Sequence, residues 1–417
     1  MPIQSFSTGS QFERFEVHLK TERYAAQIQR RYLWLVRRFV DYLGRKSIAV
    51  DAVHASELED FLRWELRSWR ARHRRAPRSI FEWGRRYKTA IHTFFRLVHG
   101  RWPAVAAPTT AIEAFHRDLV QGYDTWMREL RGLASVTRSR RTTEALEFLI
   151  ELGPRGDQES LARLGVGDID AYLRQRCKGF RRRTIGVHTV CLRSFLCYLH
   201  GSGRTALDLS CTVLGPRIYD NEQVPAALRP EEVQAVLAAA RQDCSPIGRR
   251  DYAFLMLLAS YGLRAGEIIA LRLEDLDWRK EILHVRHSKT GAESELPLLR
   301  EAGEAVLSYL EKARPESKYR ELFLQVRAPY RAYRCGSILN CVISARLKMA
   351  GITARGRKGP HAFRHARAVS LLHAAVPLKV IGDVLGHRSE ESTAVYLKLA
   401  TEDLRAVGLN IPKEVLQ

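Results

Sequence analysis

The sequence of 417 residues predicts a mainly α-helical protein that has a small antiparallel β-sheet in its C-terminal half. Apolar residues recur at every third or fourth position over long stretches, which is typical of amphipathic helices. Two short alternating stretches on either side of a Lys-Thr-Gly turn indicate the strands. A hydrophobic content of 46% allows sizeable cores, and the length indicates two or three domains.

The first 100 residues are predicted to form a bundle of helices. A helix is predicted over residues 25–43, where arginines cover the faces that are not apolar. A second helix is predicted over 56–69, with Ser56 as its N-cap and Glu59 three residues further on. A third is predicted over 80–98. The apolar face of the first helix consists of Ile28, Tyr32, Leu35, Phe39 and Leu43.

A second helical block follows a break rich in Pro and Ala at residues 102–108. Its segments are RTTEALEFLIEL, GDIDAYLRQRCKGF and HTVCLRSFLCYLHG. The first block has a similar order of RRYLWLVRRFVDYL, SELEDFLRWELRSW and YKTAIHTFFRLVHG. The matching endings at 94–100 and 195–201 indicate a duplicated helical module, although amphipathic helices also resemble one another by chance.

The last part of the chain follows a stretch rich in Gly, Pro and polar residues at 201–225. Pro230, at an early helical position and followed by two glutamates, predicts the start of a new helix. Residues 282–287 and 293–298 predict two strands joined by a tight turn. We therefore expect helical domains at 1–105 and 109–205, a linker at 206–224 and a third domain at 225–417.

The charge of the chain points to a polyanionic partner. Lys and Arg number 68 and Asp and Glu 46, which gives a net charge of +22 and an isoelectric point near 10.0. The first 200 residues hold 36 of the basic and 21 of the acidic residues, so +15 of this charge lies there. Because neutralising a polyanion releases its counterions, nucleic acid is the expected partner. A membrane surface is the alternative that charge alone leaves open.

Cysteine usage and hydropathy predict a protein of the reducing cytoplasm. The seven cysteines form no CxxC pair, which argues against a zinc ribbon and against a disulfide framework. The N-terminal MPIQSFSTGS lacks the basic-then-apolar pattern of a signal peptide, and no apolar run approaches the roughly 18 residues of a membrane span. We therefore expect neither export nor membrane insertion.

Arg264 is the first candidate for chemistry. An apolar helix over 251–261 is predicted to end at Gly262 as a left-handed C-cap, so that Arg264 begins the next helix beside Glu267. This places a guanidinium at a helix junction. A lone arginine is more often part of a structural ion pair than an anion clamp, so other residues have to decide its role.

Further polar residues suit a phosphate group. Lys289 lies on the predicted turn between the strands, where its ammonium can reach outwards. A helix predicted from residue 361 places His361 and Arg364 one turn apart on one face. His361 and His365 also have the i, i+4 spacing of a zinc site, but the glutamate of the HExxH motif is absent, and no metal is expected.

His387 and Tyr396 complete the candidates. A helix is predicted to end at Gly386, immediately before His387, and Tyr396 lies on a segment with helical potential at 392–399. Taken singly, Lys289 is explained as a solvated turn residue and Tyr396 as a packed aromatic residue.

The order Arg264, Lys289, His361-x-x-Arg364, Leu385-Gly386-His387 and Tyr396 resembles the active-site signature of the tyrosine recombinases, also called phage integrases. The resemblance covers roughly residues 228–400 and includes the strings YGLRAGE, HSKTG, HAFRH and LGHRS. It implies that the third domain is a tyrosine-recombinase catalytic domain and that the helical modules are DNA-binding modules similar to the family's core-binding domain. The protein would be a site-specific DNA recombinase without metal or other cofactor, and integrase, resolvase and transposase roles stay open.

The resemblance also implies a mechanism. A tyrosine hydroxyl has an ordinary pKa near 10, so ionising it at pH 7 costs about 4 kcal/mol and attack on a phosphate needs help. Tyr396 would form a 3′-phosphotyrosyl bond, with His361 as proton acceptor and Lys289 as the acid for the departing 5′ oxygen. Glu267 would orient its neighbours. The phosphate oxygens would be held by Arg264, Arg364 and His387.

Two features depart from the family's pattern. Family members usually carry one core-binding domain, so the role of the extra module is open, and Arg367 stands where a small residue is common. The resemblance further implies double-stranded DNA as partner and four protomers on two DNA sites, with sister recombinases among the candidates. The segment Glu402–Gln417 would then pass to a neighbouring protomer.

Three other functions compete with the recombinase. A type IB topoisomerase shares the tyrosine chemistry but relaxes a single duplex, and the HSKTG and LGH strings favour the recombinase. A non-catalytic DNA-binding protein would not need every catalytic position to be filled. A membrane-bound protein should show a wide apolar helix face that lacks core partners.

Overall fold

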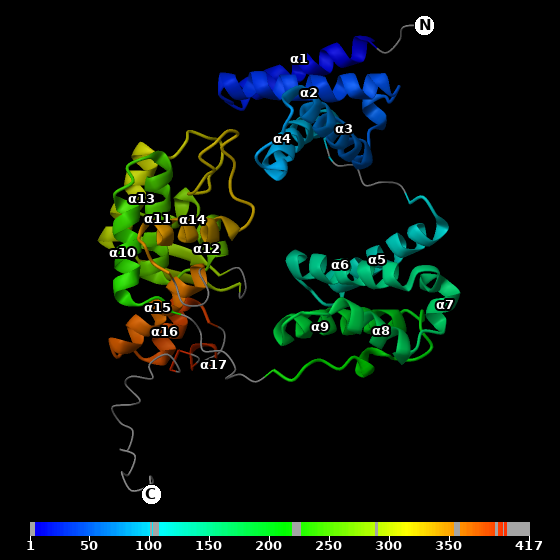
Figure 1. Ribbon diagram of the computed structural model, residues 1–417. Coiled ribbons are helices and arrows are strands. Elements are labelled where there is room, and N and C mark those ends of the chain that lie inside the picture. The colour runs from blue at the N-terminus through cyan, green and yellow to red at the C-terminus, as the bar shows by residue number, and fades with distance from the viewer. Residues whose placement is uncertain are drawn as a thin grey trace, which may run out of the picture. The chain divides into compact units, whose positions relative to one another are not determined.

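The computed structural model describes residues 5–100, 102, 108–218, 227–287, 291–353, 359–387, 391–394 and 396–397. Within these residues helices dominate and the strands form one three-stranded antiparallel sheet, so the predicted fold class is confirmed (Figure 1). The chain forms two compact units, one of residues 1–102 and 223–417 and one of residues 103–222. None of the described helices is both long and apolar enough to cross a membrane.

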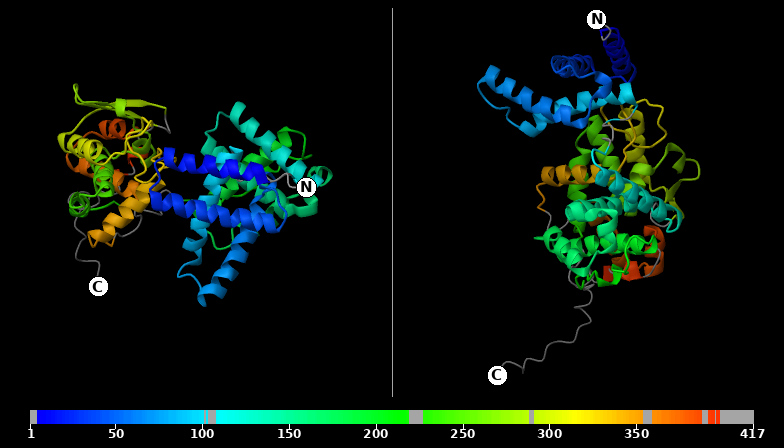
Figure 2. Two further views of the ribbon diagram at one scale, coloured as in Figure 1. Left: turned by 90° about the horizontal axis from the view of Figure 1, so that it is seen from above. Right: turned by 90° about the vertical axis from the view of Figure 1, so that its right-hand side faces the viewer.

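The helices of the N-terminal part share an aromatic core. Phe39, Phe61 and Phe95 come from three different helices and are fully buried against one another. Helices α1 and α2 lie side by side (Figure 2). The helices of this part are α1 (Ser5–Thr21), α2 (Ala26–Arg45), α3 (Ala55–His73) and α4 (Ile80–His99), with a short 3-10 turn at Val50–Ala52.

The predicted N-cap at Ser56 is wrong. Helix α3 begins at Ala55, and its N-cap is His54, whose backbone N–H donates to Oε2 of Glu57 at 2.8 Å. Glu57, rather than Glu59, is three residues from the cap and can reach back to it. Helix α1 was not predicted at all.

The second helical module, described over 108–218, has a core of its own. Tyr123, Phe148 and Phe195 pack together in it. Leu209 and Val213, from the stretch expected to be a linker, are also buried there. The helices are α5 (Ala111–Glu129), α6 (Ser135–Leu152), α7 (Gln158–Ala162), α8 (Val166–Arg176) and α9 (Arg182–Gly201), with 3-10 turns at Gly153–Gly156 and Ser210–Thr212. The expected domain boundaries and the duplication stay predictions.

The C-terminal part is built around α11, which contacts α10, α13, α14 and α15. Strand β2 pairs with β1 and with β3, and Leu283 lies opposite Leu296. The two predicted strands are therefore confirmed to within one residue, whereas β1, only two residues long, was missed. The elements are α10 (Pro230–Arg241), α11 (Pro246–Tyr261), α12 (Ala265–Ala270), a 3-10 turn at Leu273–Asp275, β1 (Leu276–Asp277), β2 (Ile282–Arg286), β3 (Glu293–Pro297), α13 (Arg300–Lys312), α14 (Ser337–Met349), α15 (Pro360–His373), α16 (Leu378–Leu385) and α17 (Glu391–Ala394).

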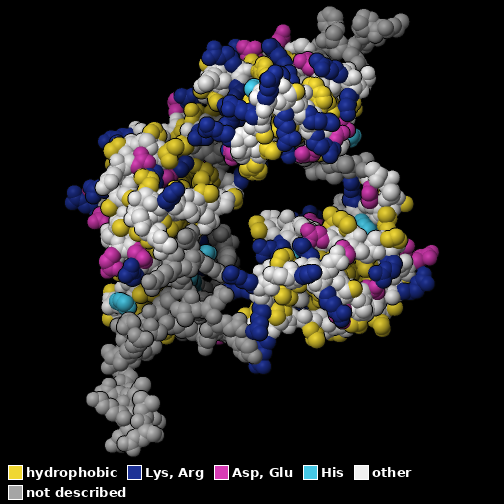
Figure 3. Space-filling view, viewed as in Figure 1, with side chains coloured by type: hydrophobic (Ala, Val, Ile, Leu, Met, Phe, Trp, Pro, Cys, Tyr) yellow, Lys and Arg dark blue, Asp and Glu magenta, His cyan; other side chains and the backbone are white. Residues whose placement is uncertain are grey.

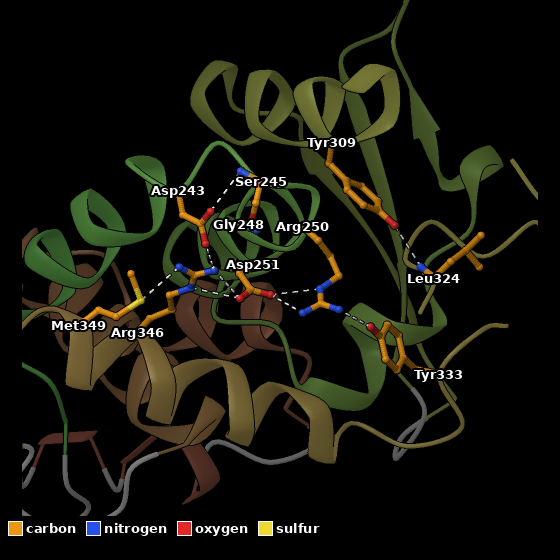
Figure 4. Close-up of polar contacts among 10 residues, drawn as sticks. All are labelled: Asp243, Ser245, Gly248, Arg250, Asp251, Tyr309, Leu324, Tyr333, Arg346 and Met349. Carbon is orange, nitrogen blue, oxygen red and sulfur yellow. Dashed lines mark hydrogen bonds and ion pairs between the residues drawn. The ribbon is translucent and has the colours of Figure 1, made fainter. Parts of the chain in front are cut away.

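A buried ionic network ties α11 to α14 (Figure 4). Asp251 accepts from Arg250 at 2.6 Å through one oxygen and from Arg346 at 2.8 Å through the other. Arg346 also pairs with Asp243 at 2.8 Å, and Arg250 donates to the hydroxyl of Tyr333 at 2.7 Å. Two carboxylates thus balance two guanidiniums away from solvent, which is the condition under which buried charges are tolerated.

Replacing Asp251 by alanine is expected to lower the free energy of unfolding by about 3–5 kcal/mol, because both buried arginines lose a carboxylate. Urea unfolding of the full chain, followed through its successive transitions, would measure this loss. Glu304→Ala is the control, since it breaks the solvent-exposed pair of Glu304 with Arg300 and should leave the transitions unchanged. Equal effects of the two substitutions would contradict a structural role of the network.

Candidate active site

Arg264 is held by Glu267 at the start of α12. Helix α11 ends at Gly262 with φ 65°, as predicted, and Arg264 is the N-cap of α12. The buried carboxylate of Glu267 accepts from the backbone N–H of Arg264 at 2.8 Å and from its Nη1 at 2.7 Å. Burial alone would raise the pKa of Glu267, but hydrogen bonds from His287 and Arg264 outweigh it and lower the pKa to about 2. Glu267 is therefore ionised and fixes Arg264.

Arg364 is buried, and its guanidinium bridges the ends of two helices. Nη1 donates to the carbonyl of Gly262 at 2.9 Å and Nη2 to that of Leu385 at 2.5 Å. Arg264 donates through Nη2 to the carbonyl of Gly386 at 3.2 Å. Both guanidiniums thus converge on the turn that ends α16. Burial and the positive charge of Arg264 lower the pKa of Arg364, whereas Tyr396 opposes this shift.

His387 follows that turn and is neutral at pH 7. Gly386 has φ 63°, which confirms the predicted helix end. Nδ1 of His387 lies 2.8 Å from Oγ1 of the buried Thr393. Burial, followed by the charges of Arg364 and Arg264, lowers the pKa of His387 to about 4. A neutral imidazole can use its other nitrogen toward a ligand.

Tyr396 is buried beside these groups. Its side chain is 4% exposed and packs against Ala368, Ile381 and Leu385. Its ring lies nearly parallel to that of His387, with the centroids 6.0 Å apart. Of the helix predicted over 392–399, the structure describes α17 and residues 396–397. The packed-aromatic interpretation of Tyr396 is thus correct as far as it goes, but the ring also lies among polar groups of the candidate site.

Two predicted residues stand apart from this cluster. Lys289 lies outside the described residues, and so does the segment 402–417. Helix α15 begins at Pro360, one residue before the predicted start, and His361 is exposed on it. The expectation that His361 and Arg364 share one face therefore meets an exposed imidazole and a buried guanidinium.

The sequence analysis missed two histidines. His365 lies with its ring 5.4 Å from that of Tyr396 and 6.2 Å from that of His361. His287 is buried, with Nδ1 3.0 Å from Oε1 of Glu267. Both residues stand in strings of the signature, HAFRH and HSKTG, and this was the available signal. Among the residues that the structure describes, no group of three or more His, Cys, Asp or Glu side chains could hold a metal ion.

The shifted pKa values predict acid destabilisation of this site. The pKa of His387 is about 4 in the fold and ordinarily 6.5, so between these values only the unfolded chain takes up the proton. Stability should therefore decrease as the pH falls from 6.5 to 4, by up to about 3 kcal/mol from this group. Glu267, lowered from 4.5 to about 2, continues the loss below pH 4.5. The unfolding temperature, measured near pH 7.5 and near pH 5, should show the difference.

His387→Gln is the control for this prediction, because glutamine does not titrate in this range. The variant should lose less of its unfolding temperature between the two pH values than the wild type does. An equal loss in both proteins would assign the acid sensitivity to other groups.

Comparisons with known proteins identify the family. Residues 226–403 match the family model of the phage integrase family. The "Putative integrase/recombinase y4gC" of Sinorhizobium fredii is 54% identical over 189 residues, which is 45% of this chain and 97% of the relative. The tyrosine recombinase XerC of a Roseiflexus species is 26% identical over 287 residues, which is 67% of this chain and 88% of the relative.

A solved structure has a similar fold. It is the crystal structure of a lambda integrase(75-356) dimer bound to a COC' core site, and the TM-score is 0.53 at 16% identity. The match covers 72% of this chain and 99% of that chain. The chain belongs to the phage integrase family of tyrosine recombinases, enzymes that recombine DNA by cleaving and rejoining its strands.

Proposed function

We propose that Tyr396 is the nucleophile of this site-specific DNA recombinase and that it forms a 3′-phosphotyrosyl intermediate. The observation that carries the proposal is the convergence of Arg264 and Arg364 on the turn before His387, beside the ring of Tyr396. Two cations and a neutral imidazole at one place form a site for a phosphodiester, whose negative charge increases during attack. These groups come from segments far apart in the sequence.

The cleavage step uses these groups in defined roles. The Oη of Tyr396 forms a bond to the scissile phosphorus while the bond from phosphorus to the 5′ oxygen breaks. His361 takes the tyrosine proton and Lys289 gives a proton to the 5′ oxygen, both assigned from the signature. Arg264 and Arg364 neutralise the non-bridging oxygens.

His387 contributes a hydrogen bond rather than a charge. Its pKa of about 4 keeps the ring neutral at pH 7. If the hydroxyl of Thr393 donates to Nδ1, the second ring nitrogen carries the proton and can donate to a phosphate oxygen. Glu267, which is ionised, holds Arg264 in place. Rejoining reverses the step with a 5′ hydroxyl as nucleophile, and the phosphotyrosyl bond supplies the energy.

Double-stranded DNA is the proposed partner. Arginines and lysines are spread over the displayed face of α1–α4, and the N-terminal half holds most of the net charge (Figure 3). We assign both helical modules to DNA binding, in which phosphate contacts supply affinity. Four protomers on two DNA sites, with or without sister recombinases, would carry out strand exchange, in the cytoplasm and at the nucleoid.

The test is the covalent intermediate itself. Purified protein is incubated in EDTA with nicked duplexes from the ends of its own locus, because a nick lets the 5′ fragment diffuse away and traps the adduct. A denaturant-stable adduct is digested with trypsin and analysed by mass spectrometry. DNA is expected on the peptide 389–398, whose single tyrosine is Tyr396. Attachment to another residue, or binding of every duplex without an adduct, would overturn the proposal.

A further inference from the structure

His287 is buried at the centre of the candidate site but has no role in the chemistry proposed above. Its side chain is fully enclosed, immediately after the end of β2. Nδ1 lies 3.0 Å from Oε1 of Glu267, and Nε2 lies 3.0 Å from Oγ of Ser294 on β3. The carboxylate oxygen that meets Nδ1 also accepts from Nη1 of Arg264 at 2.7 Å. Imidazole, carboxylate and guanidinium thus form one chain of hydrogen bonds.

The backbone of His287 is fixed as well. Its N–H donates to the carbonyl of Ala292 at 2.8 Å, and its carbonyl accepts from the N–H of Gly291 at 2.8 Å. These two bonds join the end of β2 to the residues that precede β3. Since both backbone groups of His287 are bonded, its ring has little freedom to leave Glu267.

The ring also lies against the turn that ends α16. A methyl group on Gly386 would overlap the imidazole of His287, and Gly386 has φ 63°, so glycine is needed there for two reasons. The carbonyl of Gly386 accepts from Nη2 of Arg264. His287 therefore contacts both of the groups that orient Arg264, the Glu267 carboxylate and the Gly386 turn.

We propose that His287 is a positioning residue for Arg264. Through Glu267 and the Gly386 turn it holds the guanidinium in the orientation that meets the scissile phosphate. The proposal rests on the proposed function, in which Arg264 neutralises a non-bridging oxygen. Loss of His287 should therefore slow cleavage and leave the affinity for DNA unchanged.

Three variants of the full chain separate the side chain's contributions. His287→Phe keeps a ring of similar size and removes both hydrogen bonds, and we expect single-turnover cleavage to slow about 10- to 100-fold. His287→Asn keeps a donor near the position of Nδ1 and should restore most of the rate. Tyr309→Phe is the stability control, because it removes a different buried hydrogen bond of the same domain, the one accepted from Leu324 at 3.1 Å.

A charge-neutral substrate provides a readout that a merely structural defect would not move. A methylphosphonate at the scissile position replaces one non-bridging oxygen by a methyl group and removes the charge that Arg264 would neutralise. The defects of His287→Phe and Arg264→Ala, each relative to wild type, should both shrink on this substrate, whereas any defect of Tyr309→Phe should be the same on both.

Two outcomes would overturn the positioning role while wild type still forms the adduct. One is a cleavage rate of His287→Phe equal to that of wild type, and the other is a defect of the same size on both substrates. A wild type that forms no adduct on any substrate would instead overturn the proposed function. The two failures are therefore distinguishable.

Discussion

Tyr396→Phe is expected to bind DNA as the wild type does and to form no covalent adduct. The phenylalanine ring keeps the apolar contacts with Ala368, Ile381 and Leu385, so the local packing should survive. Only the oxygen that would attack phosphorus is lost, and no other side chain can replace it in the same geometry. Cleavage of a nicked duplex should fall at least about 10⁴-fold, to the limit of detection, because triad-type nucleophile losses have this size.

Tyr261→Phe is the matched control for that variant. Tyr261 is also a buried tyrosine, but its hydroxyl donates to the carbonyl of Pro297 at 2.9 Å and accepts from the N–H of Leu299 at 2.8 Å. It should lower stability and leave adduct formation intact. An adduct in Tyr396→Phe, or its loss in Tyr261→Phe alone, would contradict the assignment of the nucleophile.

Arg364→Ala should slow cleavage by about 10³-fold or more at saturating protein. A phosphate clamp is lost, and the carbonyls of Gly262 and Leu385 lose a buried donor, which costs about 1–3 kcal/mol each in stability. Arg364→Lys keeps a positive charge but cannot reproduce the fork of donors, so it should restore folding better than it restores the rate. Single-turnover cleavage and urea unfolding would measure the two effects separately.

Arg367→Ala is the control, one turn further along α15. Arg367 is half-buried, and its Nε has no hydrogen-bond partner among the described residues. Its removal should leave the single-turnover rate close to that of the wild type. If Arg367→Ala and Arg364→Ala slowed cleavage equally, the effect would belong to the packing of α15 and not to the phosphate clamp.

Local signals predicted most of the elements. The periodicity of α2 and α4, the glycine at the end of α11, Pro230 at the start of α10 and the alternation of β2 and β3 each act within a few residues. They are therefore visible in one stretch of sequence. Prediction failed where local signals were ambiguous, as at the start of α3, where two glutamates compete for one cap.

The sequence by itself determined the fold class and the order of the site residues, because periodicity, caps and the spacing of the signature are properties of the chain. Only the tertiary structure brought Arg264, Arg364, His387 and Tyr396 together and added His287 and His365 to them. It also decided that Tyr396 is buried and that His387 is neutral. Desolvation and neighbouring charges shift a pKa, and both depend on contacts between segments that lie far apart in the sequence.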